Sequence, residues 1–191
     1  RKLVYTDATC PLVTKVHNEA VKFSKAKYET VLIGHVGHQE LIGTSGYVDD
    51  EVRHIVETEE DIDNLNIDPE ANVAFITQTT ISVDDTEAMI TKLKEKFKNL
   101  NAPPRSDLCY ATQNRQDAVK ELAKKCDRII ICGSPNSSNS NRLVKTGQKA
   151  GCESYIIDEV NELDFNVFEG KEKIGISSGA SVPRIIVDQL V

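Results

Sequence analysis

The sequence predicts an α/β fold of two similar three-layer units, each a mostly parallel sheet covered by helices on both faces. Short runs of apolar and β-branched residues alternate along the chain with longer segments in which apolar residues recur at helical spacing. The same order of runs then occurs a second time, about 99 residues later. Such alternation of strands and helices is typical of parallel sheets, whose functional residues follow the carboxyl ends of the strands.

The composition is that of an ordinary globular protein, with 39% hydrophobic and 28% charged residues among 191. The formal net charge of −7 argues against a nucleic-acid partner held by a broad basic surface. The chain has no apolar run near the ~20 residues that a membrane-spanning helix needs, so we expect no membrane contact. Five cysteines without a CxxC pair predict a reducing compartment rather than disulfide bonds.

We expect the chain to begin within a strand at 2–5, because it starts with Arg1 and its only methionine is Met89. The spacing of Val16, Ala20 and Phe23 predicts a helix over 11–26. We expect strands at 30–33, 54–57 and 72–76, a loop at 34–40, a short helix at 59–65, a helix that starts at Ser82 with a capping-box-like Asp85, and a linker at 101–106.

The second half repeats this plan. A helix after 107–109 carries Val119, Leu122, Ala123 and Cys126 on one face. We expect strands at 128–132, 154–157 and 173–177, a helix from about Arg142, and a last helix with Pro183 in its first turn. Adding 99 takes Cys10 to Cys109, Gly34 to Gly133, Ser82 to Ser181 and Val83 to Val182.

Cys10 and Cys109 each stand just before a predicted helix, at the same place in the two units. The start of a helix carries partial positive charge, which favours the thiolate that a metal or an iron–sulfur cluster binds. The alternative is a buried structural thiol, which we expect of Cys126, Cys132 and Cys152. Two thiolates are too few for a cluster or a closed zinc site, so we expect a third ligand upstream.

Three polar segments follow predicted strands. The loop at 34–40 offers two histidines and Glu40, the run at 137–141 offers serine and asparagine donors ahead of a helix, and the runs at 77–80 and 178–181 occupy matching positions. These features favour an anionic ligand held by neutral donors. A polar turn and a flexible serine–asparagine linker are the alternatives for the first two. The sequence contains no phosphate loop of the Walker type and no GxGxxG motif.

Several stretches together resemble one family, the 4-hydroxy-3-methylbut-2-enyl diphosphate reductase (LytB) family. The resemblance covers nearly the whole chain in order. It is carried by residues 7–17 around Cys10, 34–40, 77–80, 107–112, 114–116 and 136–143. At position 39 this chain has glutamine where the family usually has proline, and Glu40 is retained.

The resemblance implies a pseudo-threefold arrangement of three α/β domains around a [4Fe–4S] cluster held by three cysteines. Residues 1–9 would end an absent first domain, 10–105 would form the second and 106–191 the third. Cys10 and Cys109 would be two of the cluster ligands, with the third outside this chain. Glu40 would be the proton donor, aided by Thr79. The implied substrate-binding residues are His38, Thr80, Ser137, Ser138, Asn139 and Ser181.

The implied reaction removes the hydroxyl group of an allylic diphosphate with two electrons and two protons, in the last step of the methylerythritol phosphate route to isoprenoids. Ferredoxin or flavodoxin would supply the electrons, in the cytoplasm or a plastid-type organelle. With only two ligands, the chain by itself is expected to be inactive. Two rival functions are a non-enzymatic anion-binding module and a zinc hydrolase that uses Cys10, Cys109 and His38.

Overall fold

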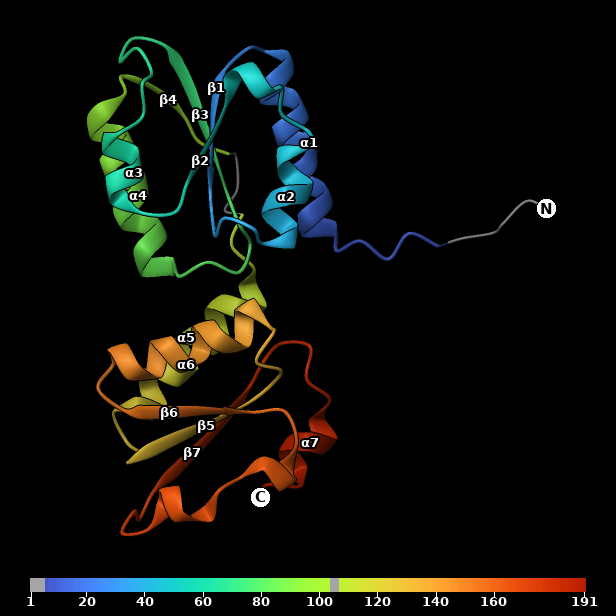
Figure 1. Ribbon diagram of the computed structural model, residues 1–191, viewed down its shortest axis with the longest axis vertical. Coiled ribbons are helices and arrows are strands. Elements are labelled where there is room, and N and C mark those ends of the chain that lie inside the picture. The colour runs from blue at the N-terminus through green and yellow to red at the C-terminus, as the bar shows by residue number, and fades with distance from the viewer. Residues whose placement is uncertain (1–5, 104–106) are drawn as a thin grey trace, which may run out of the picture. The chain divides into compact units, whose positions relative to one another are not determined.

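The computed structural model describes residues 6–103 and 107–191, which divide into two compact units, residues 1–108 and 109–191 (Figure 1). The division falls three residues beyond the expected 105/106 boundary. The assignment of residues 1–9 to an upstream domain stays a prediction, and the expected strand at 2–5 lies outside the described residues. No helix in the described part of the chain has the length and apolar character needed to cross a membrane.

The first unit is a four-stranded parallel sheet in the order β2-β1-β3-β4, with helices on both faces. Helices α1 and α2 lie on one side of this sheet and α3 and α4 on the other (Figure 1). The elements are α1 (Pro11–Lys25), β1 (Glu29–Ile33), α2 (Gln39–Ser45), a 3-10 turn (Asp50–Val52), β2 (Arg53–Val56), α3 (Glu59–Asp63), β3 (Asn72–Thr77), α4 (Val83–Lys96) and β4 (Asn99–Asn101).

The core of the first unit consists of two apolar layers, because alternate side chains of each strand point to opposite faces. Val31 and Phe75 pack in the layer beneath α3 and α4, together with Leu93. Leu32 and Ile76 pack in the layer beneath α1 and α2. Both faces of β1 and β3 are therefore buried, which explains why these strands are continuous apolar runs in the sequence.

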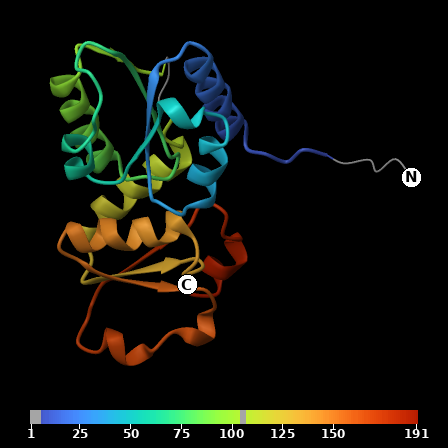
Figure 2. The ribbon, with the colours of Figure 1, turned by 45° about the horizontal axis from the view of Figure 1, so that its top comes forward.

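The second unit is a three-stranded parallel sheet in the order β6-β5-β7. Helices α5 and α6 lie together on one face of it, and the two 3-10 turns lie on the other side (Figures 1 and 2). Its elements are α5 (Tyr110–Ala123), β5 (Arg128–Cys132), α6 (Ser138–Lys149), β6 (Glu153–Ile157), 3-10 turns at Val160–Glu162 and Phe165–Phe168, β7 (Ile174–Ser178) and α7 (Arg184–Asp188).

The strand order β2-β1-β3 of the first unit recurs as β6-β5-β7 in the second, which confirms the internal repeat, but the offset between the units is not constant. It is 99 residues for α1 and α5 and for β1 and β5. The Gln78 amide donates to the Ile33 carbonyl at 2.8 Å, and the Gly179 amide donates to the Cys132 carbonyl at 2.9 Å. Since Ile33 and Cys132 are 99 positions apart, and Gln78 and Gly179 are 101 apart, two residues have been inserted in between.

This insertion arises around the second helix of each unit, which has 7 residues in α2 and 12 in α6. The expected matches of Ser82 with Ser181 and of Val83 with Val182 are therefore wrong. Ser82 corresponds instead to Pro183, and both residues cap the following helix. The expected match of 77–80 with 178–181 is confirmed by the strand register, in which Thr77 and Ser178 hold equivalent positions.

The helix starts beside the ligand loops differ from the expectation. Helix α2 begins at Gln39, so the end of the expected 34–40 loop is helical. Helix α6 begins at Ser138, four residues before the expected start at Arg142, because the Ser137 side chain caps it by accepting the Ser140 amide. Polar residues that read as a loop therefore form a capped first turn.

Two further expectations on individual segments were wrong. The sequence did not indicate β4, which has only three residues, pairs in parallel with β3 and ends at Asn101, the residue at which the linker was expected to begin. Cys126 lies three residues beyond the end of α5 rather than on its apolar face.

Candidate functional site

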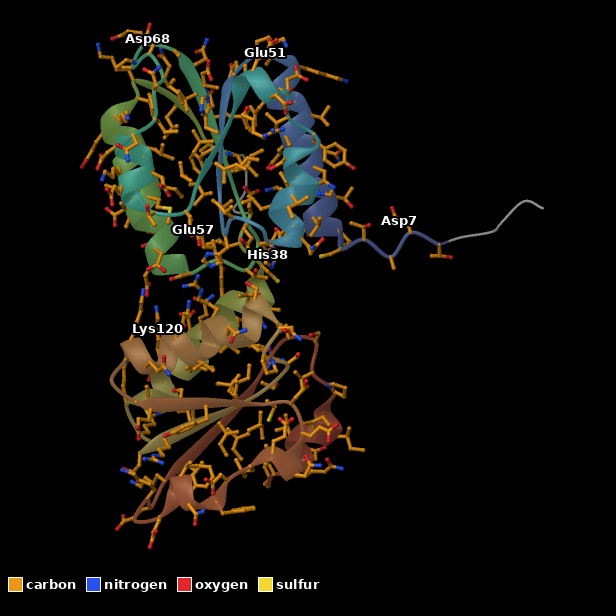
Figure 3. The ribbon with its side chains drawn as sticks, in the orientation of Figure 1. Asp7, His38, Glu51, Glu57, Asp68 and Lys120 are labelled. Carbon is orange, nitrogen blue, oxygen red and sulfur yellow. The ribbon has the colours of Figure 1, made fainter. Side chains whose placement is uncertain are left out.

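In the first unit, the polar residues after β1, β2 and β3 gather at one end of the sheet, since all these strands are parallel. Figure 3 shows His38 and Glu57 at this end, whereas Glu51 and Asp68 lie at the opposite one. The loop after β1 carries His38 and leads into α2, and the loop after β3 carries residues 77–80.

His38 is the N-cap of α2. Its Nδ1 accepts a hydrogen bond from the Glu40 amide at 3.2 Å. A ring nitrogen that accepts carries no proton, so the neutral ring has its proton on Nε2. His38 is half-buried and thus presents an N–H donor beside the positive end of a helix.

Glu40 and Thr79 form a direct pair, although they are 39 positions apart in the chain. Glu40 Oε1 accepts from the Thr79 amide at 2.7 Å, and Oε2 accepts from Thr79 Oγ1 at 3.0 Å. Thr79 is buried and Glu40 is half-buried. Both carboxylate oxygens are therefore held in place, and the Thr79 hydroxyl points its proton at the carboxylate.

Gln78 joins the two loops of this end. Its Oε1 accepts from the His35 amide at 3.0 Å, and its Nε2 donates to Thr80 Oγ1 at 2.9 Å. Gly34 makes room for it, because a Cβ at position 34 would lie 2.9 Å from both Cβ and Oε1 of Gln78. The sequence pattern did not single out Gln78, although it is a buried amide directly after a strand.

Glu57 holds the first part of the 34–40 segment. Its Oε1 lies 2.7 Å from His35 Nδ1, and its Oε2 accepts from the Val36 amide at 3.1 Å. The hydrogen bond with His35, and then the one from Val36, lower the pKa of the Glu57 carboxyl. The turn also needs Gly37, whose φ is +84°.

Asp107 fixes the end of β3 from within the same unit. Its side chain is fully buried, with Oδ2 accepting from the Thr77 amide at 3.1 Å and Oδ1 accepting from Lys15 Nζ at 2.7 Å. Burial, and then the negative charge of Asp107, raise the pKa of the neighbouring Glu19 carboxyl. The sequence did not single out Asp107, which stands two residues before Cys109.

In the second unit, the first turn of α6 is packed onto the ends of two strands. Ser140 is buried, and a Cβ at Gly133 or at Gly179 would lie 2.2 Å or 2.5 Å from its Oγ. Gly133 has a φ of +155°, a backbone conformation that also favours glycine at this position. This packing brings the 137–139 segment next to the 178–181 loop.

Within that arrangement, Asn139 has a buried amide oxygen that finds no hydrogen-bond partner among the described residues. The position of its Nδ2 is 3.6 Å from where a Cβ of Gly179 would stand. Ser181 is exposed at the end of the same loop. A buried polar atom without a partner is costly, so the amide group of Asn139 is not fully satisfied by the described residues.

The two cysteines of the repeat are both helix N-caps. Cys10 caps α1 and Cys109 caps α5, and neither side chain accepts a capping hydrogen bond. Cys10 is exposed and Cys109 is half-buried, whereas burial raises the pKa of both the Cys132 and the Cys152 thiols. Across residues 6–103 and 107–191, no three or more His, Cys, Asp or Glu side chains stand together as ligands for a metal ion.

Comparison with known proteins decides the family. The family model described as LytB protein matches all 191 residues. The chain belongs to the LytB family. Among curated relatives, the 4-hydroxy-3-methylbut-2-enyl diphosphate reductases of Psychrobacter arcticus and Nitrosomonas europaea are 46% and 48% identical to this LytB chain over its full length. The chain spans 61% and 60% of those two relatives.

Two solved structures are also similar to this LytB chain. The E-1-hydroxy-2-methyl-but-2-enyl-4-diphosphate reductase from Plasmodium falciparum has a TM-score of 0.92 and 38% identity, with 96% of this chain and 57% of that chain covered. A structure named as (E)-4-hydroxy-3-methyl-but-2-enyl diphosphate reductase, the terminal enzyme of the non-mevalonate pathway, has a TM-score of 0.57 and 33% identity, with 96% and 65% covered. These matches confirm the α/β fold.

The structure thus gathers the candidate residues of this LytB chain into two sets. His38, Glu40, Thr79 and Thr80 lie at one end of the first unit, and Ser137, Ser138, Asn139 and Ser181 lie at the corresponding end of the second. Cys10 and Cys109 stand at equivalent helix starts.

Proposed function

We propose that the protein containing this chain is a reductase that removes the hydroxyl group of 4-hydroxy-3-methylbut-2-enyl diphosphate. Two electrons and two protons convert this substrate into isopentenyl or dimethylallyl diphosphate and water. One proton leaves with the hydroxyl oxygen as water, and the other is added to carbon. The proposal is supported by the names of the relatives, and the single observation that carries it is the Glu40–Thr79 pair.

We propose Cys10 and Cys109 as two of three ligands of a [4Fe–4S] cluster, with the third cysteine outside the printed chain. The donors fit this group: both are thiols at equivalent helix starts, and neither side chain makes a capping hydrogen bond. The cluster would supply the electrons and an iron that accepts the substrate hydroxyl. A chain with only two of these ligands is expected to be inactive by itself.

Glu40 and Thr79 are the proposed acid. In the ionised state the Thr79 hydroxyl donates to Glu40 Oε2. When Glu40 takes up a proton, this hydrogen bond reverses, and Thr79 Oγ1 can pass its own proton to the substrate oxygen while it receives the one from Glu40. The amide of Thr79 keeps Oε1 in place, so the acid does not have to reorganise during the transfer.

The diphosphate is proposed to bind through neutral donors. In the second unit these are Ser137, Ser138 and Asn139 at the start of α6, where backbone N–H groups also point outward, together with Ser181 on the loop whose Gly179 packs against Ser140. In the first unit they are Nε2 of His38 and the hydroxyl of Thr80. Hydroxyl and amide donors hold an anion without adding basic residues, in keeping with a chain of net charge −7.

Ferredoxin or flavodoxin is the proposed electron donor, and the cytoplasm or a plastid-type organelle the proposed compartment. A reducing compartment agrees with five free thiols, all of which lie in the described part of the chain.

A Glu40→Gln substitution in the intact protein tests the proposal. It should retain the iron–sulfur absorption of anaerobically prepared protein but lower kcat by about 10²-fold or more, since an amide cannot supply the proton. Glu51→Gln, at the opposite end of the sheet, is the matched control and should leave kcat unchanged (Figure 3). Unchanged turnover in Glu40→Gln would remove Glu40 from this role.

The rival functions give different results in the same preparation. Colourless wild-type protein that still binds diphosphate would support the anion-binding module. Stoichiometric zinc with hydrolytic activity, lost on substitution of Cys10, would support the zinc hydrolase. Either result would overturn the reductase proposal.

A further inference from the structure

Arg115, on helix α5, holds the end of strand β7 in the second unit. Its Nη1 donates to the carbonyl oxygen of Ser178 at 2.8 Å and to Ser178 Oγ at 3.0 Å. Ser178 is buried and is the last residue of β7. One guanidinium nitrogen therefore restrains both the backbone and the side chain of the residue at which the 178–181 loop begins.

The loop is short enough for this restraint to reach its far end. The Gly179 amide donates to the Cys132 carbonyl at 2.9 Å, and the Val182 amide donates to the Gly179 carbonyl at 3.2 Å. Only Ala180 and Ser181 lie between these two anchored positions. A shift of Ser178 would thus be passed on to Ser181, one of the residues proposed to bind the diphosphate.

The equivalent position of the first unit has a comparable restraint. Thr77 corresponds to Ser178 in the strand register, and its amide donates to the buried carboxylate of Asp107. The charges of the two restraining groups differ because the carboxylate accepts from an N–H, whereas the guanidinium donates to a carbonyl. The Thr77 amide and the Ser178 carbonyl stand at strand ends, and each is hydrogen-bonded by a side chain of its own unit instead of a neighbouring strand.

We propose that Arg115 is a positioning residue for the diphosphate, which holds the 178–181 loop so that Ser181 stays beside the first turn of α6. Arginine suits this task because its guanidinium stays charged and donates from a rigid plane. The inference rests on the proposed function, since it takes the diphosphate as the ligand. It gives a role to one residue of the 114–116 motif that the proposed reaction does not otherwise use.

The test compares Arg115→Gln, Arg115→Lys and the control Arg128→Gln in the intact protein. Arg128 pairs with Glu153 at the other end of β5, so its loss removes the same charge from the same unit without touching the loop. Three quantities are measured: KM and kcat with the allylic diphosphate, exchange rates of the Gly179 and Val182 amides, and the change of those rates on adding inorganic diphosphate.

We expect Arg115→Gln to raise KM about tenfold with kcat within about twofold, and to speed exchange of both amides by at least about tenfold. Arg115→Lys, which retains a donor, should recover a large part of both effects, and Arg128→Gln should show neither. A merely structural role would instead lower the amount of folded protein and leave KM unchanged.

Two results would overturn the inference. Unchanged amide exchange with a raised KM would make Arg115 a direct ligand of the diphosphate instead of a positioning residue. Unchanged KM would show that the loop does not need it. A different result would contradict the proposed function itself: in wild-type protein, the exchange rates of the Gly179 and Val182 amides would not change on adding diphosphate. That result would also overturn the inference about Arg115.

Discussion

The contact between Gly179 and the first turn of α6 yields a prediction that can be worked out from distances. In Gly179→Ala the new Cβ would stand 2.5 Å from Ser140 Oγ, well inside van der Waals contact, and 3.4 Å from Val182 Cγ2. Ser140 is only 1% exposed, so its hydroxyl has little room to move away. Overpacking of this kind costs about 1–3 kcal/mol, and we expect the second unit to lose that much stability.

A second substitution isolates the cause. Ser140→Ala removes Oγ, after which the nearest atom to the new Cβ at position 179 is Val182 Cγ2 at an ordinary 3.4 Å. The double variant should therefore recover most of the loss, with a coupling energy of about 1–2 kcal/mol. Gly133→Ala is the matched control that should not recover, because its Cβ would still lie 2.8 Å from Ser140 Cβ and its φ is +155°.

Native-state amide exchange is the suitable assay, because it measures the stability of each of the two compact units from its own amides. The slowest amides of β5 report the free energy of unfolding of the second unit, and those of β1 report the first unit as an internal reference. If Gly179→Ala lowers the unfolding free energy of the second unit equally in the wild-type and Ser140→Ala backgrounds, the steric argument is refuted. No loss in Gly179→Ala would show that the first turn of α6 is not packed against this loop.

Three further predictions concern other groups. Folding lowers the pKa of Glu57, so its ionised carboxyl stabilises the fold above the unfolded value near 4.5, and this stabilisation is lost as the pH falls through the lower folded value. Glu57→Gln should therefore reduce the loss of unfolding free energy on acidification, measured by urea unfolding at several pH values. Asp107→Asn should destabilise the first unit by about 1–3 kcal/mol in the exchange assay, because the charged acceptor of Lys15 and of the Thr77 amide is lost while Lys15 keeps Glu19 as a second partner. An unchanged stability of the first unit would contradict the restraint. Cys126→Ala should retain the iron–sulfur absorption of the intact protein, whereas Cys10→Ala should lose it. Loss of the cluster in Cys126→Ala would contradict the assignment of Cys126 as a structural thiol.

Much of the fold could be read from local patterns. The strands at β1, β3 and β5 are buried on both faces, so each is a continuous apolar run that stands out in the sequence. The helix α1 shows its buried face through the spacing of Val16, Ala20 and Phe23. The repeat was visible for the same reason, since both units need the same order of runs.

Boundaries were harder where a helix starts with polar residues. The side chains of His38 and Ser137 cap α2 and α6, and residues of the kind that follow them also occur in loops. The insertion of two residues around these helices was not visible in the sequence either, because a constant offset of 99 fits the short runs on either side. The backbone hydrogen bonds locate it: the Gly34 amide donates to the Val56 carbonyl and the Gly133 amide to the Ile157 carbonyl, so the offset is already 101 at β2 and β6.

The sequence by itself determined which residue types stand where each strand ends and each helix begins: thiols before two helices, and hydroxyl, amide and imidazole donors after the strands. That much depends on neighbours in the chain. The tertiary structure alone decided that Glu40 contacts Thr79, that Asp107 and Arg115 restrain equivalent strand ends, and that two glycines seat Ser140. The physical reason is that these contacts join distant segments, and the register of parallel strands, which no local pattern specifies, sets which atoms meet.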